Sequence, residues 1–172
     1  MNTNNTETTI DYRPSLAFYH ANGKGTGCAA KFELHPAHDS TEGAILLRLA
    51  NQRLGDGSAN PRIYPSFDWD GAITIRLAFA DVCEFLRVFR GECESIQDGK
   101  GLFHRYVGGA MKVSLRHMVE PLLCYSLEAC RLDSDGNEYS ACIVLSSAEA
   151  LGLSLALEDS MGLIAFGVPK VD

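Results

Sequence analysis

The sequence predicts an α+β fold built from two ββββα repeats, in which two antiparallel four-stranded sheets pack together with two helices. Three observations lead to this prediction. Short runs of alternating apolar and polar residues dominate the chain, each group of four runs ends in a helical pattern, and short stretches of the first half recur in the second. With 172 residues, 46% of them hydrophobic, the chain can bury a core without a disulfide or a metal.

The first repeat contains four strand patterns, at residues 15–20, 27–35, 43–50 and 72–79. A glycine-rich turn at residues 21–27 joins the first two strands, and the composition of residues 51–62 predicts a loop. Asp81 followed by Glu84 is typical of a helix start, and apolar residues then recur at helical spacing as far as Cys93.

The second repeat follows the same order, with strand patterns at residues 101–106, 111–118, 122–133 and 138–145. Asp135-Gly136 predicts a hairpin turn, and Ser146 with Glu149 predicts the start of the second helix. Two short echoes support a duplication. Phe18-Tyr19-His20 is similar to Leu102-Phe103-His104, and residues 30–34 are similar to residues 111–115.

These patterns divide the chain into a disordered tail at residues 1–13 and a single pseudo-symmetric domain at 14–172, with repeats at about 14–100 and 101–172. No apolar run reaches the ~20 residues of a membrane span, so no membrane association is expected. The six cysteines form no Cys-x-x-Cys pair and lie mostly in apolar segments, which is typical of reduced cysteines in a cytoplasmic protein.

The net charge of −7 disfavours nucleic acid as a partner, because a basic domain is the usual electrostatic signature. The charge is uneven, however. Residues 13–53 carry five basic residues against three acidic ones, which leaves room for a local basic surface.

Phe67-Asp68-Trp69, just before the predicted fourth strand, resembles a Tyr-Asp-Trp motif of the Whirly family of single-stranded-DNA-binding proteins. Further similar segments follow in the family's order: Gly91-Glu92-Cys93-Glu94-Ser95, Lys112-Val113, Val119-Glu120-Pro121-Leu122 and Asp135-Gly136. The family's Lys-Gly-Lys-Ala-Ala-Leu signature falls near residues 24–31, where Lys24, Gly25, Ala29 and Ala30 match but the second lysine and the tight spacing are lost.

The resemblance implies a Whirly-like fold of the single-stranded-DNA-binding regulator type, with self-association to a dimer or tetramer. Guide-RNA-binding proteins of similar fold extend the implied ligand to single-stranded RNA. Such binding needs cations for phosphates and flat rings on which bases stack. The candidate nucleic-acid-binding residues are Tyr19, Lys24, Lys31, Arg48, Phe67, Trp69, Arg76, Arg105 and Lys112. Since residues two apart on a strand share a face, Phe67 and Trp69 are expected to project together.

Other functions have weaker support. Residues 23–27 evoke a phosphate loop but join two strands and lack the Walker order. His35-Pro36-Ala37-His38-Asp39 offers metal-ligating types without a spacing that demands a metal, and residues 133–138 fit a hairpin better than a calcium loop. No catalytic constellation appears, so a non-enzymatic protein without a cofactor is expected. The alternative is a protein-interaction or assembly module of the same fold that does not bind nucleic acid.

Overall fold

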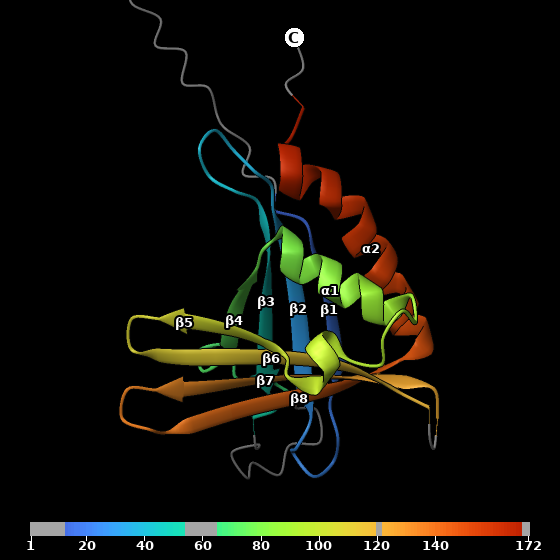
Figure 1. Ribbon diagram of the computed structural model, residues 1–172. Helices are drawn as coiled ribbons and strands as arrows, with labels where there is room; N and C mark the ends of the chain where they lie inside the picture. Colours follow the sequence, from blue (N-terminus) through green and yellow to red (C-terminus); the bar gives the residue numbers. More distant parts are fainter. Residues whose placement is uncertain (1–12, 54–64, 120–121, 170–172) are drawn as a thin grey trace, which may run out of the picture.

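The computed structural model describes residues 13–53, 65–119 and 122–169 and contains two antiparallel sheets of four strands each (Figure 1). Sheet one has the order β1-β2-β3-β4, and sheet two has the order β5-β6-β7-β8. The strands of sheet one are β1 (Ser15–His20), β2 (Cys28–His35), β3 (Ala44–Asn51) and β4 (Ile73–Leu77). The strands of sheet two are β5 (Leu102–Tyr106), β6 (Gly109–Met118), β7 (Cys124–Asp133) and β8 (Glu138–Ser146).

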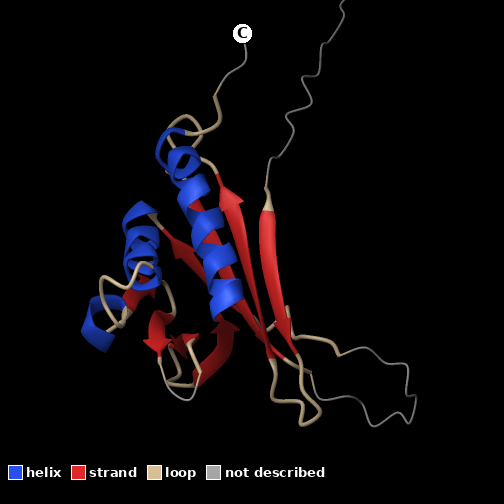
Figure 2. Cartoon of the chain, turned by 90° about the vertical axis from the view of Figure 1, so that its right-hand side faces the viewer, coloured by secondary structure: helices blue, strands red, loops and turns tan. Residues whose placement is uncertain are grey.

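Each sheet is followed by one helix, α1 (Phe79–Phe89) after β4 and α2 (Ser147–Phe166) after β8. The strands of the two sheets run across one another, and one end of sheet two projects beyond β4 (Figure 1). Figure 2 shows α2 lying along the strands of sheet one, with α1 beside it. The two ββββα repeats that the sequence predicts are therefore present in the predicted order.

The core lies between the two sheets and beneath the helices. Strand alternation directs one face of each sheet inward, and the helices close the sides. The largest fully buried side chains come from both sheets and both helices: Leu47, Leu49, Ile75, Leu77, Phe85, Ile96, Leu115, Leu127, Ile143, Leu145, Leu153 and Leu157. No buried polar or charged residue occurs among the residues described. The opposite face of each sheet is left free for other roles.

The two helices begin differently. The α2 start is as predicted, since the Ser146 hydroxyl accepts a hydrogen bond from the Glu149 amide at 3.3 Å and the Glu149 carboxylate accepts from the Ser146 amide at 2.8 Å. The predicted start of α1 at Asp81 is wrong. This helix begins at Phe79, and Asp81 is its third residue, with a carboxylate that accepts from the Ala78 amide at 2.9 Å. Because Ala78 has no side-chain acceptor, the usual sequence signal for an N-cap is missing.

The remaining differences are small. The predicted strand at residues 72–79 is shortened to β4 because Phe79 enters the helix. A short 3₁₀ segment at Ile96–Gly99 was not predicted, and Gln97 and Asp98 there adopt positive φ angles of 48° and 53°. The predicted tail at residues 1–12 and most of the predicted loop at 51–62 lie outside the described residues.

Candidate nucleic-acid interface

The register of sheet one separates its two faces. Lys31 on β2 pairs with Arg48 on β3, and Arg48 pairs with Thr74 on β4, so these three side chains share one face. Tyr19 lies on the same face, because it comes two residues after Ala17, the β1 partner of Lys31. The intervening residues, such as Leu47, point into the core. We call the face with Tyr19, Lys31, Arg48 and Thr74 the outer face of sheet one.

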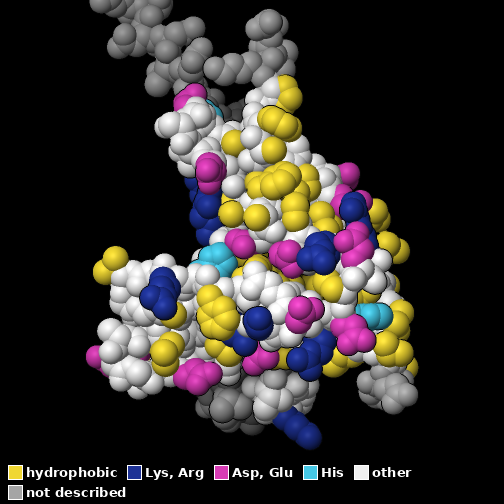
Figure 3. All heavy atoms as spheres, in the orientation of Figure 1, with side chains coloured by type: hydrophobic (Ala, Val, Ile, Leu, Met, Phe, Trp, Pro, Cys, Tyr) yellow, Lys and Arg dark blue, Asp and Glu magenta, His cyan; other side chains and the backbone are white. Residues whose placement is uncertain are grey.

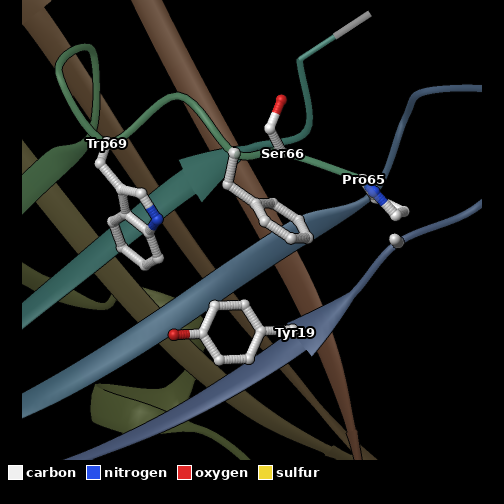
Figure 4. Close-up of a pocket in the computed structure, with 6 residues that line it drawn as sticks. Tyr19, Pro65, Ser66 and Trp69 are labelled. Atoms are coloured by element: carbon white, nitrogen blue, oxygen red, sulfur yellow. The ribbon is translucent and has the colours of Figure 1, made fainter. Parts of the chain in front are cut away.

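Three aromatic rings meet on this outer face. The ring of Tyr19 lies with its centroid 5.7 Å from that of Phe67 and 6.4 Å from that of Trp69, at interplanar angles of 52° and 82°. Together with Ala21, Pro65 and Ser66 they line an open hollow of about 450 Å³, and Figure 4 shows Tyr19 and Trp69 projecting over the strands toward it (Figure 4). Tyr19 is 59% exposed. We call Tyr19, Phe67 and Trp69 the ring cluster.

Backbone pairing holds two of these rings in place. Phe67 forms an isolated antiparallel bridge with Gln52, just beyond the end of β3. The Asp68 amide donates to the Asn51 carbonyl at 2.9 Å. Phe67 and Trp69 line the same hollow, as the prediction from their two-residue spacing expects.

The turn after Trp69 is fixed by charge. Arg53 donates to Asp68 at 2.9 Å and to Asp70 at 3.0 Å, and the hydrogen bond from Arg53 lowers the pKa of Asp68, with a backbone bond from Gly71 acting in the same direction. A Cβ at Gly71 would stand 2.3 Å from the Asp68 carboxylate, so a larger residue there would displace the Asp68 side chain. Hydrogen bonds from Arg53 therefore hold the turn that follows Trp69, next to the ring cluster.

Arg48 joins the ring cluster to the rest of the outer face. Its guanidinium lies 5.5 Å from the centroid of the Trp69 ring and donates to the Trp69 carbonyl at 2.7 Å. This geometry is a cation–π contact that leaves part of the guanidinium free.

The other predicted cations of sheet one are also paired. Lys31 donates to Glu33 at 2.8 Å, and this hydrogen bond lowers the pKa of Glu33. Arg76 donates to the carbonyls of Glu42 at 2.6 Å and Gly43 at 3.4 Å. Their positive charge is therefore partly compensated before any ligand arrives.

Lys24 is exposed in the turn between β1 and β2, close in sequence to Tyr19. The Asn22 carboxamide accepts from the amides of Lys24 and Thr26 at 3.0 and 3.1 Å, and Gln52 accepts from the Asn22 amide at 2.9 Å. The turn joins two strands, as predicted, and its internal hydrogen bonds present the Lys24 ammonium to solvent.

Arg105 and Lys112 lie on the other sheet. Register places Lys112 opposite Phe103, and its ammonium lies 5.4 Å from the centroid of the Phe103 ring. Phe103 is 67% exposed, yet it was not among the predicted site residues. The signal was present in the sequence, because the repeat echo aligns Phe103 with Tyr19. Seven of the nine predicted residues thus belong to sheet one and its adjoining turns, and two belong to sheet two.

The motifs that suggested other chemistry have structural partners. His35 contacts Glu33 at 2.8 Å, and His38 contacts Asp39 at 2.8 Å, so these two histidines face different carboxylates. No group of three or more metal-ligating side chains converges within the described ranges. The Asp133 carboxylate accepts from the amides of Asp135 and Asn137 at 3.0 and 2.8 Å, which is the hairpin turn that the sequence predicts.

All six cysteines are free thiols. Cys28 is buried, and burial raises the pKa of its thiol to about 12, so it stays protonated and unreactive at neutral pH. Of the helices that the structure describes, none is both long and apolar enough to cross a membrane.

Comparison with known proteins establishes the fold. No protein-family model and no curated sequence matches the chain. Solved structures do match. WHY1 from Arabidopsis thaliana superposes with a TM-score of 0.67 at 15% identity, covering 90% of this chain and 86% of WHY1. WHY3 from the same plant gives the same TM-score and identity, with 89% of WHY3 covered.

Two further solved structures match. MRP1/MRP2 of Trypanosoma bruciei matches with a TM-score of 0.61 at 14% identity, covering 88% of this chain and 85% of that chain. A guide-RNA-binding protein complex bound to a guide RNA matches with a TM-score of 0.60 at 15% identity, covering 87% and 90%. The fold of this chain is therefore Whirly-like, as the resemblance of its sequence implies.

Proposed function

We propose that this chain binds single-stranded nucleic acid, DNA or RNA, through the outer face of sheet one. The observation that carries the proposal is the ring cluster, three aromatic side chains that meet around an open hollow beside the Arg48 guanidinium. Tyr19 is exposed and Phe67 and Trp69 are half-buried, so the three rings leave an apolar surface open to solvent, which is typical of a binding site. The guide RNA in one of the matching structures supports this ligand class.

The chemistry suits a strand whose bases are unpaired. Each base that stacks on an aromatic side chain contributes about 1–3 kcal/mol, largely independent of sequence. Bases in a duplex are already stacked on one another and offer no free face. Arg48 lies beside the Trp69 ring and Lys24 is exposed in the turn that follows β1, so both can contact phosphates of a strand bound at the rings. A protein of this kind acts by occupying the strand, which fits a regulatory and non-enzymatic role.

Fluorescence anisotropy of a labelled single-stranded oligonucleotide tests the proposal. We expect saturable binding that survives competition by duplex of the same sequence. Raising the salt should weaken binding with a slope of about −0.7 per phosphate neutralised. If neither a DNA nor an RNA oligonucleotide binds at low salt, the proposal is overturned.

A protein-interaction module is the second candidate, and one observation favours it. The net charge is −7, and the predicted cations Lys31, Arg48 and Arg76 already have acceptors within the protein. On this alternative the ring cluster contacts another protein. Equal affinity for oligonucleotides in wild type and in Trp69→Ala would favour this alternative.

We also propose that the chain self-associates with a second copy through α2. The side of α2 away from the core carries Leu151, Leu155 and Phe166, which are 62%, 54% and 91% exposed. Gly152 and Gly162 face open space, although a glycine inside a helix costs about 1 kcal/mol relative to alanine. Figure 3 shows hydrophobic side chains gathered over the helices (Figure 3). This face is mostly apolar, although it also carries the exposed Asp159, and an apolar face of this kind can pair with its own copy about a twofold axis.

Sedimentation velocity tests this assembly. We expect a dimer or tetramer for the wild type and a monomer for Leu155→Glu. Leu123→Glu, which places the same charge at an exposed leucine outside α2, is the matched control and should leave the assembly unchanged. A wild-type monomer at micromolar concentration would exclude this mode of assembly.

A further inference from the structure

A second hollow, of about 400 Å³, lies where sheet two projects beyond β4 (Figure 1). It combines aromatic rings with a guanidinium and a carboxylate. Its lining residues are Ala72, Thr74, Tyr106, Met111, Arg131, Asp133 and Tyr139. It lies on different elements from the ring cluster, whose hollow is lined from β1 and the segment before β4.

The register of sheet two explains why polar residues line this hollow. Met111, Arg131 and Tyr139 are cross-strand partners. Arg131 lies two residues from the buried Ala129 on β7, and Tyr139 lies two residues from the buried Ala141 on β8, so both belong to the inward face of sheet two. The inward face of sheet two therefore continues past the edge of sheet one, and there apolar residues give way to an arginine and a tyrosine.

Arg131 holds unused hydrogen-bonding capacity in this hollow. Its guanidinium lies 4.6 Å from the centroid of the Tyr139 ring. Within the described part of the chain it makes no hydrogen bond, although a guanidinium has five N–H donors. Asp133 lines the same hollow, and hydrogen bonds from Asn137, with support from Asp135, lower the pKa of its carboxyl. Its Oδ1 accepts from the amides of Asp135 and Asn137, and its Oδ2 accepts from the Asn137 carboxamide at 3.0 Å, so the acceptor that is left for a ligand is the second lone pair of Oδ2. The hollow thus offers a donor fork and an acceptor beside a flat ring.

The two hollows are connected across sheet one. Thr74, which lines the second hollow, is the cross-strand partner of Arg48. Arg48 lies over Trp69, which lines the first. A strand that leaves the ring cluster along Arg48 therefore reaches the second hollow without crossing the core.

We propose that the second hollow is a guanine subsite for the same single strand that binds at the ring cluster; this inference rests on the proposed function. Guanine presents two adjacent acceptors, O6 and N7, which Arg131 can contact with two N–H donors. Guanine also presents N–H donors on its Watson–Crick edge, for which the Asp133 carboxylate is an acceptor. The Tyr139 ring supplies a plane for stacking. Adenine lacks the O6 acceptor, and thymine lacks N7.

The test uses three single-stranded oligonucleotides of roughly twelve nucleotides, a length within the usual span of single-strand sites. One is all thymine, one has a single central guanine and one has a single central adenine. We expect the guanine oligonucleotide to bind about tenfold more tightly than the thymine one, a typical gain for one bidentate contact. The adenine oligonucleotide controls for purine stacking and should bind within about twofold of thymine.

Arg131→Met should abolish the guanine preference while leaving affinity for thymine unchanged. Arg116→Met is the matched control, because Arg116 is an exposed arginine on the opposite face of sheet two, and it should retain the preference. Equal binding of all three oligonucleotides by the wild type would overturn the guanine subsite and leave the proposed function standing. A preference that survives in Arg131→Met would also overturn it. Failure of all three to bind, together with failure of their RNA counterparts at low salt, would overturn both proposals.

Discussion

The outer faces of the two sheets carry the same kinds of side chain in different states of pairing. On sheet one three rings meet, and the cations Lys31, Arg48 and Arg76 each have an acceptor within the protein. On the outer face of sheet two, Phe103 is the one exposed ring among the described residues, and Lys112 beside it has no carboxylate partner there.

We infer from this difference that the two repeats contribute differently to binding, sheet one mainly through base stacking and sheet two mainly through phosphate contacts. The strands of sheet one carry cations that already have acceptors beside a cluster of three rings, and the outer face of sheet two carries Lys112, which has no carboxylate partner among the described residues, beside one ring. Base stacking and phosphate neutralisation are separable contributions to single-strand binding. If the division is correct, substitutions in the two repeats should affect different quantities.

The largest effect is expected from the ring cluster. Trp69→Ala should weaken oligonucleotide binding by about fivefold to a hundredfold, because it removes a stacking contact of about 1–3 kcal/mol. Phe103→Ala removes the ring at the equivalent place of the repeat echo and should cost less, since no second ring adjoins it. Anisotropy titrations of both variants measure the difference. An equal or larger loss for Phe103→Ala would contradict the division between the sheets.

The helix starts provide a second comparison of the repeats. Glu149 completes the cap of α2, so Glu149→Ala should lower the free energy of unfolding by about 1 kcal/mol. Ala78 leaves the cap of α1 incomplete, so Ala78→Ser should raise it by about 0.5–1 kcal/mol. Urea denaturation measures both. No gain from Ala78→Ser would mean that the Asp81 contact already satisfies this helix end.

The α2 cap also predicts a pH dependence. Partial burial opposes ionisation of Glu149, but hydrogen bonds from His20 and Ser146 outweigh it, and the pKa of Glu149 is lowered from 4.5. A lowered pKa in the folded state gives stability that is present above the ordinary value and is lost as the pH falls through the folded value. Glu149→Ala should therefore lose less stability than wild type in the acid range.

The salt dependence of binding should depend mainly on the cations of sheet two. Lys112→Ala and Arg105→Ala should each reduce the magnitude of the slope of log affinity against log salt by about 0.7, the value for one phosphate contact. Lys31→Ala should change the slope much less, because Glu33 already compensates that charge. Titrations at several salt concentrations distinguish the three. A larger change for Lys31→Ala would show that the Lys31–Glu33 pair opens on binding.

The smallest expected effect concerns that pair directly. Glu33→Gln leaves Lys31 without its carboxylate and should strengthen binding by about twofold, in the range of an exposed ion pair. Glu42→Gln, which removes a carboxylate not seen to pair with Lys31, is a control for net charge. Equal gains from the two variants would attribute the effect to net charge alone.

Much of this fold could be predicted from the sequence because alternation and helical spacing are local signals. The start of α1 could not, since Ala78 carries no capping group, and neither could the 3₁₀ segment at Ile96–Gly99, where Gln97 and Asp98 adopt a conformation that favours glycine. All three members of the ring cluster, Tyr19, Phe67 and Trp69, are among the predicted binding residues, and the sequence predicted that Phe67 and Trp69 project together but not that Tyr19 meets them.

The pairing of the cations was beyond sequence reasoning. Arg48 bonds to a carbonyl 21 residues away and Arg76 to one 34 residues away, and such contacts are set by the tertiary fold. A count of basic residues in the first repeat therefore overstates its free positive charge. The exposed ring of Phe103, by contrast, could have been predicted, because the similarity of Leu102-Phe103-His104 to Phe18-Tyr19-His20 aligns it with Tyr19.

Trp69 is the only tryptophan of the chain, so its fluorescence reports on the ring cluster alone. Titration of the wild-type protein with a single-stranded oligonucleotide tests the central claim most directly. If bases stack in the hollow beside Tyr19 and Phe67, the Trp69 emission is quenched and saturates at the same concentration as the anisotropy of the oligonucleotide. Binding by anisotropy with unchanged Trp69 emission would contradict the claim that the ring cluster is the site.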